Sequence, residues 1–316
     1  TQGAGMPCES FAPTYVESMR IVAQRLGLDP ERVTGMGTAA QMTNAAVKSL
    51  SYEELTVTAI VTGGIETNGG RVGDPATYFK KREKPRPGTI NIILILDTDM
   101  PPGVLARALV TCTEAKTAAL QELMAGSHYS TGLATGSGTD QTIVVANAES
   151  SLYLDGAGKH SKLGELIGRV VMAAVKEALD KQSGLCPVKQ HNLLRRLQRF
   201  GVTSDTVWAA YQKCAGANAA IKPVFLAALE DVVSSAALVP YGILYIHLLD
   251  EYLWQLLSPE ETRAAAGKLL EILTAATDTA MIAVDGSPGK EMIPALEQWL
   301  AESCARRLTK ENREEG

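Results

Sequence analysis

The sequence predicts an α+β protein in which a layered mixed sheet is flanked by helices and followed by an all-helical C-terminal extension. Residues 54–66 are rich in β-branched side chains and run into a glycine turn, which is typical of a strand. Residues 89–98 are nearly continuous in Ile and Leu, as expected for a strand covered on both faces. Residues 187–316 show no comparable strand pattern and are predicted to form helices joined by short polar turns.

The boundary between the two parts is predicted near residue 185, where Ser183 and Gly184 interrupt the pattern. We therefore expect a domain of mixed α and β structure at 1–185 and a helical region at 186–316. In the first part we also expect a long loop at 67–88, a glycine turn at 131–140, a strand at 141–147, and helices at 13–27, from Asp99 or Pro101 to about Met124, and at 161–181.

Composition excludes several classes of function. The formal net charge is −5, without a basic block of the kind that binds nucleic acid. The five cysteines include no CxxC pair, so we expect no zinc site, no disulfide framework and a reducing cytoplasm. Residues 232–249 are uncharged, but Pro240 interrupts them, so we expect broken buried helices and no membrane span. The first residues, TQGAGM, indicate a fragment of a longer chain.

Two polar segments border the predicted strands. Asn68, Arg71 and Asp74 lie on the loop TNGGRVGDPATY, whose glycines let a ligand approach the backbone, although Asp-Pro is also an ordinary turn signal. Thr89 follows Gly88 at the start of a strand. It is either a β-branched strand residue or a nucleophile, and a cut before it would give it a free α-amine as its own base.

Two further segments carry polar side chains. Glu114 and Lys116 are two residues apart on a predicted helix and point to different sides, where they serve either a site or a solvated face. The turn TGSGTD offers backbone amides for an anion, Asp140 can orient a donor, and His160 can act as acid or base. No HExxH, P-loop or GxSxG motif occurs, so we expect no metal ligands.

Together these segments resemble one family. VTAIVTGGIETNGGRVGDPATY, PGTINIILILDTDMPPGVLARALVTCTEAKTAALQEL, YSTGLATGSGTDQTIVVAN and GKHSKLGELIGRVV are similar to the adenosylcobinamide amidohydrolases over roughly residues 30–182. The resemblance implies hydrolysis of the amide that joins the corrin propionyl side chain to aminopropanol. It implies a corrinoid substrate and no separate cofactor, because cobalt enters only within the substrate. A corrinoid carrier or sensor and a self-processing small-peptide hydrolase remain alternatives, and homo-oligomerisation stays open.

The order of these segments is also similar to that in self-cleaving β-aminopeptidases and ornithine acetyltransferases. That similarity implies catalytic roles for Thr89 as nucleophile, Asn68 in oxyanion binding, and Ser137 and Asp140 as a supporting pair. As a mechanistic hypothesis, Asp140, Ser137 and Glu114 orient the nucleophile and water. Water activated by Glu114 or His160 is the rival mechanism. The residues expected to bind substrate or the oxyanion are Gly69, Gly70, Arg71, Asp74, Asn91, Lys116, Gly138, Thr139 and His160. Trp208, Tyr211 and Tyr245 are either core residues or a cover for the corrin.

Overall fold

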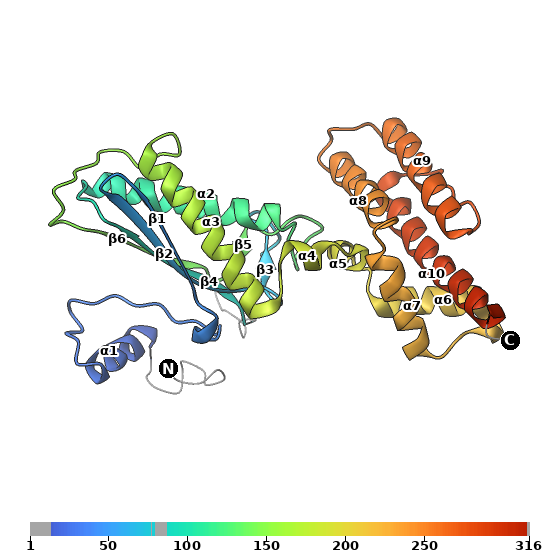
Figure 1. The fold of residues 1–316 in the computed structure, drawn as a ribbon, viewed down its shortest axis with the longest axis horizontal. Helices are drawn as coiled ribbons and strands as arrows, with labels where there is room; N and C mark the ends of the chain where they lie inside the picture. The colour runs from blue at the N-terminus through green and yellow to red at the C-terminus, as the bar shows by residue number, and fades with distance from the viewer. Residues whose placement is uncertain (1–13, 77, 80–86, 315–316) are drawn as a thin grey trace. The chain divides into compact units, whose positions relative to one another are not determined.

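The computed structural model describes residues 14–76, 78–79 and 87–314, and it divides the chain into two compact units, Thr1–Cys186 and Pro187–Gly316 (Figure 1). The first unit combines a mixed sheet with helices and the second is built from helices, so the predicted α+β class with a helical C-terminal part is confirmed. Cys8 and the basic stretch Lys80 to Arg86 lie outside the described residues.

The main sheet of the first unit has the strand order β1-β2-β4-β6. The first two pairings are antiparallel, and β4 and β6 run parallel. A second, two-stranded sheet joins β3 and β5. The elements in chain order are α1 (Tyr15–Arg25), η2 (Met42–Asn44), β1 (Ala46–Tyr52), β2 (Leu55–Gly64), β3 (Gly69–Gly70), β4 (Thr89–Leu96), α2 (Pro102–Glu122), β5 (Gly136–Ser137), β6 (Gln141–Ala146) and α3 (Lys162–Ser183).

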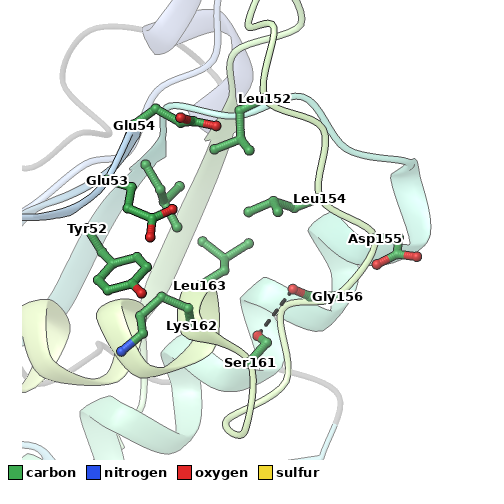
Figure 2. Close-up of a pocket in the computed structure, with 11 residues that line it drawn as sticks. Tyr52, Glu53, Glu54, Leu152, Leu154, Asp155, Gly156, Ser161, Lys162 and Leu163 are labelled. Atoms are coloured by element: carbon green, nitrogen blue, oxygen red, sulfur yellow. Dashed lines mark hydrogen bonds between the residues drawn. The ribbon is translucent and has the colours of Figure 1, made fainter.

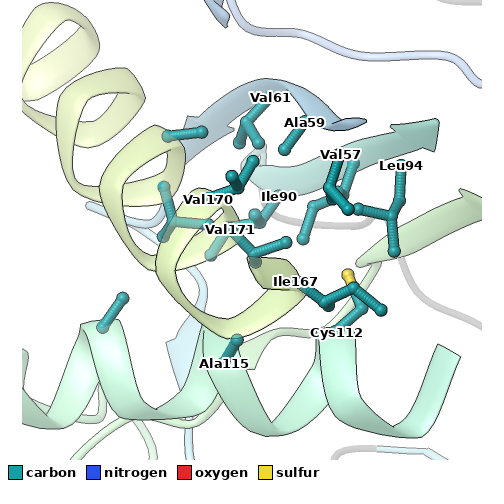
Figure 3. Close-up of a cluster of buried hydrophobic side chains, with 14 of the residues drawn as sticks. Val57, Ala59, Val61, Ile90, Leu94, Cys112, Ala115, Ile167, Val170 and Val171 are labelled. Atoms are coloured by element: carbon teal, nitrogen blue, oxygen red, sulfur yellow. The ribbon is translucent and has the colours of Figure 1, made fainter. Parts of the chain in front are cut away.

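Helices α2 and α3 cover one face of this sheet (Figures 1 and 3). Alternate residues of β4, including Ile92 and Leu94, are fully buried there against side chains such as Ile167 and Val171 of α3. Helix α3 is well delimited: Ser161 caps its first turn by accepting a hydrogen bond from the Gly164 N–H at 3.1 Å. The covered face is the hydrophobic core of the unit.

The prediction that the strand at 89–98 is buried on both faces is wrong. The second set of alternate β4 residues faces away from α2 and α3, and Ile95 on that side is 38% exposed. The run of Ile and Leu does not distinguish a doubly covered strand from one that holds aliphatic side chains on an open face. Strand β1 was also not predicted, because Lys48, Ser49 and Ser51 interrupt its few apolar residues.

The second unit encloses its own core, which includes Tyr211, Phe225, Tyr245 and Trp299. Tyr211 and Tyr245 are therefore core residues, which was one of the two interpretations of these aromatic side chains. Trp208 stacks on Tyr211. The elements are α4 (Pro187–Gln190), α5 (Leu193–Leu197), η3 (Gln198–Phe200), α6 (Ser204–Ala215), η4 (Gly216–Asn218), α7 (Lys222–Ser234), α8 (Val239–Leu253), α9 (Pro259–Thr277) and α10 (Pro288–Glu314).

Pro240 lies in the first turn of α8, immediately after the predicted helix break. Within the described residues, no single helix has the length and apolar character to cross a membrane, and α7 with α8 meets that test only as a pair bent by 78°. Among the described cysteines, Cys112 and Cys304 are buried, whereas Cys214 is exposed.

Candidate functional site

The site begins where two pairs of strands end together. In the main sheet Gly64, the last residue of β2, lies opposite Thr89, the first residue of β4. In the small sheet Gly69 pairs with Ser137, which brings the loop after β2 against the glycine turn before β6. Asn68 and Thr139 flank this small sheet, and so both reach the peptide bond between Gly88 and Thr89.

The carbonyl oxygen of Gly88 accepts two side-chain hydrogen bonds. Asn68 Nδ2 donates to it at 2.6 Å and Thr139 Oγ1 donates to it at 2.8 Å. Gly88 has φ +135°, and a Cβ there would lie 2.2 Å from Asn68 Oδ1. Only glycine fits this position, because any other residue would displace the asparagine. The two donors therefore converge on a carbonyl oxygen adjacent to Thr89.

Thr89 is buried, and its hydroxyl lies between two acceptors. Its Oγ1 is 2.9 Å from Asn91 Oδ1 and 2.9 Å from the Thr139 carbonyl oxygen. A hydroxyl has one proton and donates to one of these at a time. Asn91 Nδ2 in turn donates to the Gly37 carbonyl at 2.7 Å, which places Oδ1 toward Thr89. Both ends of the Asn91 amide are thus occupied within the protein, although we expected it to bind substrate.

Asp140 holds the glycine turn against β4. Its Oδ1 accepts from the Ile90 N–H at 2.9 Å and from Ser137 Oγ at 2.6 Å. Its Oδ2 accepts from the Ser137 N–H at 3.0 Å and from Lys116 Nζ at 2.5 Å. The Lys116 and Asp140 side chains are nearly buried. Lys116, Ser137 and Asp140 therefore form the frame that positions Thr139 beside Thr89.

Asp74 and Arg71 form a neighbouring but separate group. Asp74 Oδ2 accepts from the Arg71 N–H at 2.7 Å and from Ser127 Oγ at 2.6 Å. Burial raises the pKa of Asp74, but the hydrogen bonds from Ser127 and Ser130 and the charge of Arg71 outweigh it, so the pKa lies below its usual value. The carboxylate therefore fixes the loop after β3, while the Arg71 side chain remains exposed beside it.

Some predicted site residues are not brought to Thr89. Glu114 forms an exposed ion pair with Lys159 at 3.0 Å, and His160 is exposed on the turn before α3. The Gly69 N–H donates to the Ile65 carbonyl at 2.9 Å and is not available for an oxyanion. Gly138 is exposed and borders open space. Thr139, expected only to bind substrate, takes the donor position that we expected from these backbone amides.

Sequence reasoning missed the segment at 34–44, which contacts the site from before β1. Besides the Gly37 contact with Asn91, Thr38 Oγ1 accepts from Thr62 Oγ1 at 3.5 Å. The Gly37 N–H donates to the Tyr15 hydroxyl at 2.5 Å, which ties α1 to this segment. The only signal in the sequence was the short glycine-containing run TGMGT, which lies some fifty residues before Thr89.

Two other features lie apart from Thr89. Burial raises the pKa of the Cys112 thiol to about 12, against the lowering effect of Lys116, which makes it a poor nucleophile. A pocket of about 270 Å³ lies at the β1–β2 hairpin beside the start of α3 (Figure 2). It includes Leu55, at the opposite end of β2 from Gly64 and thus roughly 30 Å away. Within the described residues, no group of three or more His, Cys, Asp or Glu side chains is arranged to hold a metal ion.

Comparison with known proteins identifies the family. A family model described as adenosylcobinamide amidohydrolase, CbiZ, matches residues 5–187. This match covers more than half of the chain, which therefore belongs to the adenosylcobinamide amidohydrolase family, as the sequence blocks predicted. The chain is also 39% identical over 182 residues to an uncharacterized protein of Methanocaldococcus jannaschii, MJ1613, with 53% of this chain and 71% of that protein covered. No solved structure matches significantly.

Proposed function

We propose that this protein hydrolyses the corrin side-chain amide of adenosylcobinamide to adenosylcobyric acid and aminopropanol, or its phosphate, in cobalamin salvage. Membership of an amidohydrolase family supports the reaction class. The observation that carries the assignment to the Thr89 site is the pair of donors from Asn68 and Thr139 on a carbonyl oxygen next to a buried hydroxyl. Amide hydrolysis needs a nucleophile beside oxyanion donors, and this arrangement supplies both.

The first step that we propose is self-cleavage at Gly88–Thr89. Thr89 Oγ attacks the Gly88 carbonyl carbon, and the negative charge develops on the oxygen that already accepts from Asn68 and Thr139. The bond from that carbon to the Thr89 nitrogen then breaks, and the nitrogen takes up the hydroxyl proton. Water hydrolyses the resulting ester, which leaves a Gly88 carboxylate and a Thr89 with a free α-amine.

The second step uses the vacated donors on the substrate. The α-amine of Thr89 accepts the Oγ proton, Oγ attacks the amide carbonyl carbon, and Asn68 and Thr139 stabilise the oxyanion. The carbon–nitrogen bond breaks, aminopropanol leaves with the proton, and water hydrolyses the acyl-enzyme to release the acid. A preorganised donor of this kind typically contributes about 3 kcal/mol to transition-state stabilisation.

The rival mechanism, in which Glu114 or His160 activates water directly, has less support. Glu114 is engaged with Lys159 on the outer side of α2, whereas Lys116 of the same helix reaches Asp140 at the site. No hydrogen bond among the described residues joins Glu114 or His160 to Thr89, Asn68 or Thr139. The geometry therefore favours the hydroxyl nucleophile.

The test is incubation of the purified protein with adenosylcobinamide, followed by chromatography and mass spectrometry of the corrinoids. Formation of adenosylcobyric acid is the expected result, and the intact mass of the same sample is expected to show two fragments from a cut between Gly88 and Thr89. Formation of product by an uncut chain would support the proposed reaction and overturn the self-cleavage step. Binding of the corrinoid without formation of product would indicate that the protein is a corrinoid carrier and not an enzyme.

A further inference from the structure

The polar row beside Thr89 is buried although neither α2 nor α3 covers that face of the main sheet. Thr89 and Asn91 alternate along β4 on the side away from these helices, and Thr62 of β2 lies opposite Asn91. The side chains of Thr89, Asn91 and Thr62 are only 6%, 5% and 7% exposed. On the same side of β4, Ile95 is 38% exposed. Another part of the chain therefore covers the end of the sheet that carries Thr89.

The segment that covers this row consists of residues 34–44, which we name the strap. The Gly37 carbonyl accepts a hydrogen bond from Asn91 Nδ2 at 2.7 Å. The next residue of the strap, Thr38, accepts through Oγ1 from Thr62 Oγ1 at 3.5 Å. Two consecutive residues of the strap thus contact two paired residues of the sheet. The strap therefore lies over the row that adjoins the candidate nucleophile.

The strap is attached to the rest of the first unit by side chains and not by a strand ladder. Within the described part of the chain, residues 33–40 form no backbone–backbone hydrogen bond. The anchor is Gln182 of α3, whose Oε1 accepts from the Gln41 N–H at 3.1 Å and from Asn44 Nδ2 at 3.0 Å. A segment with so few backbone hydrogen bonds opens at a lower free energy cost than a strand of the sheet does.

Helix α1 holds the strap at a second point, and Figure 1 shows this helix on the opposite side of the main sheet from α2 and α3. The Tyr15 hydroxyl accepts from the Gly37 N–H at 2.5 Å, and a Cβ on Gly37 would lie 3.2 Å from the Tyr15 ring. A Cβ on Gly35 would lie 3.4 Å from Sδ of Met19, one turn along α1. Tyr15 is 42% exposed, so its contact with the strap can break without opening the hydrophobic core.

With the strap closed, Thr89 is too buried to meet a substrate that comes from solvent. Its hydroxyl lies between the Asn91 amide and the Thr139 carbonyl, and attack on an amide requires the reacting atoms to approach to about 3–3.5 Å. Self-cleavage uses a peptide bond that is already beside the hydroxyl. Hydrolysis of a corrinoid amide does not have this advantage. The first reaction can therefore proceed under a closed strap, whereas the second requires the strap to open.

We infer that the strap is a movable cover over Thr89, latched by Tyr15 and anchored by Gln182. Its opening breaks the contacts of Gly37 with Tyr15 and Asn91 and admits the substrate amide. Its closing returns the Gly37 carbonyl to Asn91, which orients the amide that holds the Thr89 hydroxyl. Tyr15 is thus a positioning residue that acts on the nucleophile through the strap. The inference rests on the proposed function for the identity of the substrate.

Access to residue 89 can be measured without catalysis. Thr89→Cys places a thiol there, and mass spectrometry follows its alkylation by iodoacetamide. Adding Tyr15→Phe removes the hydroxyl that accepts from Gly37 and keeps the ring, so alkylation at residue 89 should become about fivefold faster, the equivalent of one net hydrogen bond. Tyr52→Phe is the matched control, because Tyr52 of β1 is 47% exposed, and it should leave the rate within about twofold.

A disulfide can lock the strap shut. In Thr38→Cys/Thr62→Cys the two sulfur atoms replace hydroxyl oxygens that are 3.5 Å apart, so a small movement allows a bond of about 2 Å. Oxidation is expected to lower turnover of adenosylcobinamide at least about tenfold, and a reductant is expected to restore it. The cut between Gly88 and Thr89 is expected in both forms, because self-cleavage does not require the strap to open. Intact mass measures both the crosslink and the cut.

These measurements separate the strap from the proposed function. Equal alkylation of Thr89→Cys with and without Tyr15→Phe overturns the movable strap, as does undiminished turnover by the crosslinked protein. Cys112 is fully buried under the other face and reports unfolding of the core. If Tyr15→Phe accelerates alkylation at Cys112 as much as at residue 89, Tyr15 stabilises the whole unit and the latch is overturned. If the parent releases no cobyric acid, the proposed function fails, and alkylation at residue 89 alone decides whether the strap moves.

Discussion

The two faces of the main sheet have opposite characters. The face under α2 and α3 buries aliphatic side chains completely, for example Ile92 and Leu94. The other face, one residue along the same strand, carries Thr89 and Asn91 and then the half-exposed Ile95. Because side chains alternate along a strand, one short run of residues supplies both the core and the site.

This difference shows how the fold separates stability from chemistry. Substitutions on the covered face should act on the free energy of unfolding, since they leave cavities in a close-packed core. Substitutions near Thr89 on the other face should act on turnover, because in the proposed mechanism their side chains hold the nucleophile. The predictions below test that separation, from the largest expected effect to the smallest.

Replacing the nucleophile should abolish activity. Thr89→Ala is expected to lower turnover of adenosylcobinamide by at least about 10³-fold and to leave the chain uncut at Gly88–Thr89. The free energy of unfolding should change by only about 1 kcal/mol, the net value of the hydrogen bond to Asn91 or Thr139. Turnover and intact mass measure the result, with Thr89→Ser as the variant that retains a hydroxyl. Undiminished turnover in Thr89→Ala would remove the covalent mechanism.

Replacing a neighbouring residue of the covered face should do the reverse. Leu94→Ala is expected to lower the free energy of unfolding by about 2–5 kcal/mol, because Leu94 is fully buried. Urea unfolding measures this, and the corrinoid affinity of the folded fraction should not change. Ile95→Ala is the matched control and should cost less than about 1.5 kcal/mol. Equal costs at the two positions would contradict the contrast between the faces.

A carboxyl in place of the Asn91 amide should introduce a new pH dependence. In Asn91→Asp the protonated carboxyl can donate to the Gly37 carbonyl and accept from Thr89, as the amide does. The ionised form cannot donate, and it faces the Gly37 oxygen. Turnover of the variant, expressed as a fraction of the parent value at the same pH, should therefore be highest at low pH and fall as pH rises through the pKa of the new carboxyl.

The parent protein serves as the reference for this pH profile and should lack the descending limb. Asn147→Asp offers a matched change at the far end of the sheet from Thr89. There Asn147 Nδ2 donates a hydrogen bond to Asp97 Oδ1 at 2.8 Å. An Asn91→Asp profile parallel to that of the parent would show that Asn91 does not position the nucleophile.

The smallest effect is expected at Glu114. Glu114→Gln removes an exposed ion pair with Lys159, and such surface pairs contribute about 0–1 kcal/mol. Turnover should stay within about twofold of the parent value across the pH range, and Lys159→Gln should behave in the same way. A loss above about 100-fold in Glu114→Gln alone would instead support water activation by this carboxylate.

Much of the architecture could be predicted because local sequence patterns report it directly. The β-branched run before Gly64, the Ile-rich run after Thr89 and the amphipathic α3 appear where they were predicted. The four sequence blocks also gave the family, because several ordered segments are more specific than any single glycine motif. The same patterns did not reveal β1 or the open face of β4, since half-polar strands and aliphatic runs are ambiguous by themselves.

By itself, the sequence determined most of the elements, the family and the residue types available for the candidate site, including Thr89, Asn68 and Asp140. Only the tertiary structure decided which of them meet. Pairing of β3 with β5 brings Asn68 and Thr139 onto the Gly88 carbonyl, while the helical phase of α2 sends Lys116 to Asp140 and Glu114 to Lys159. These contacts join residues up to about fifty positions apart, and no local pattern encodes them because they depend on strand register and helix packing.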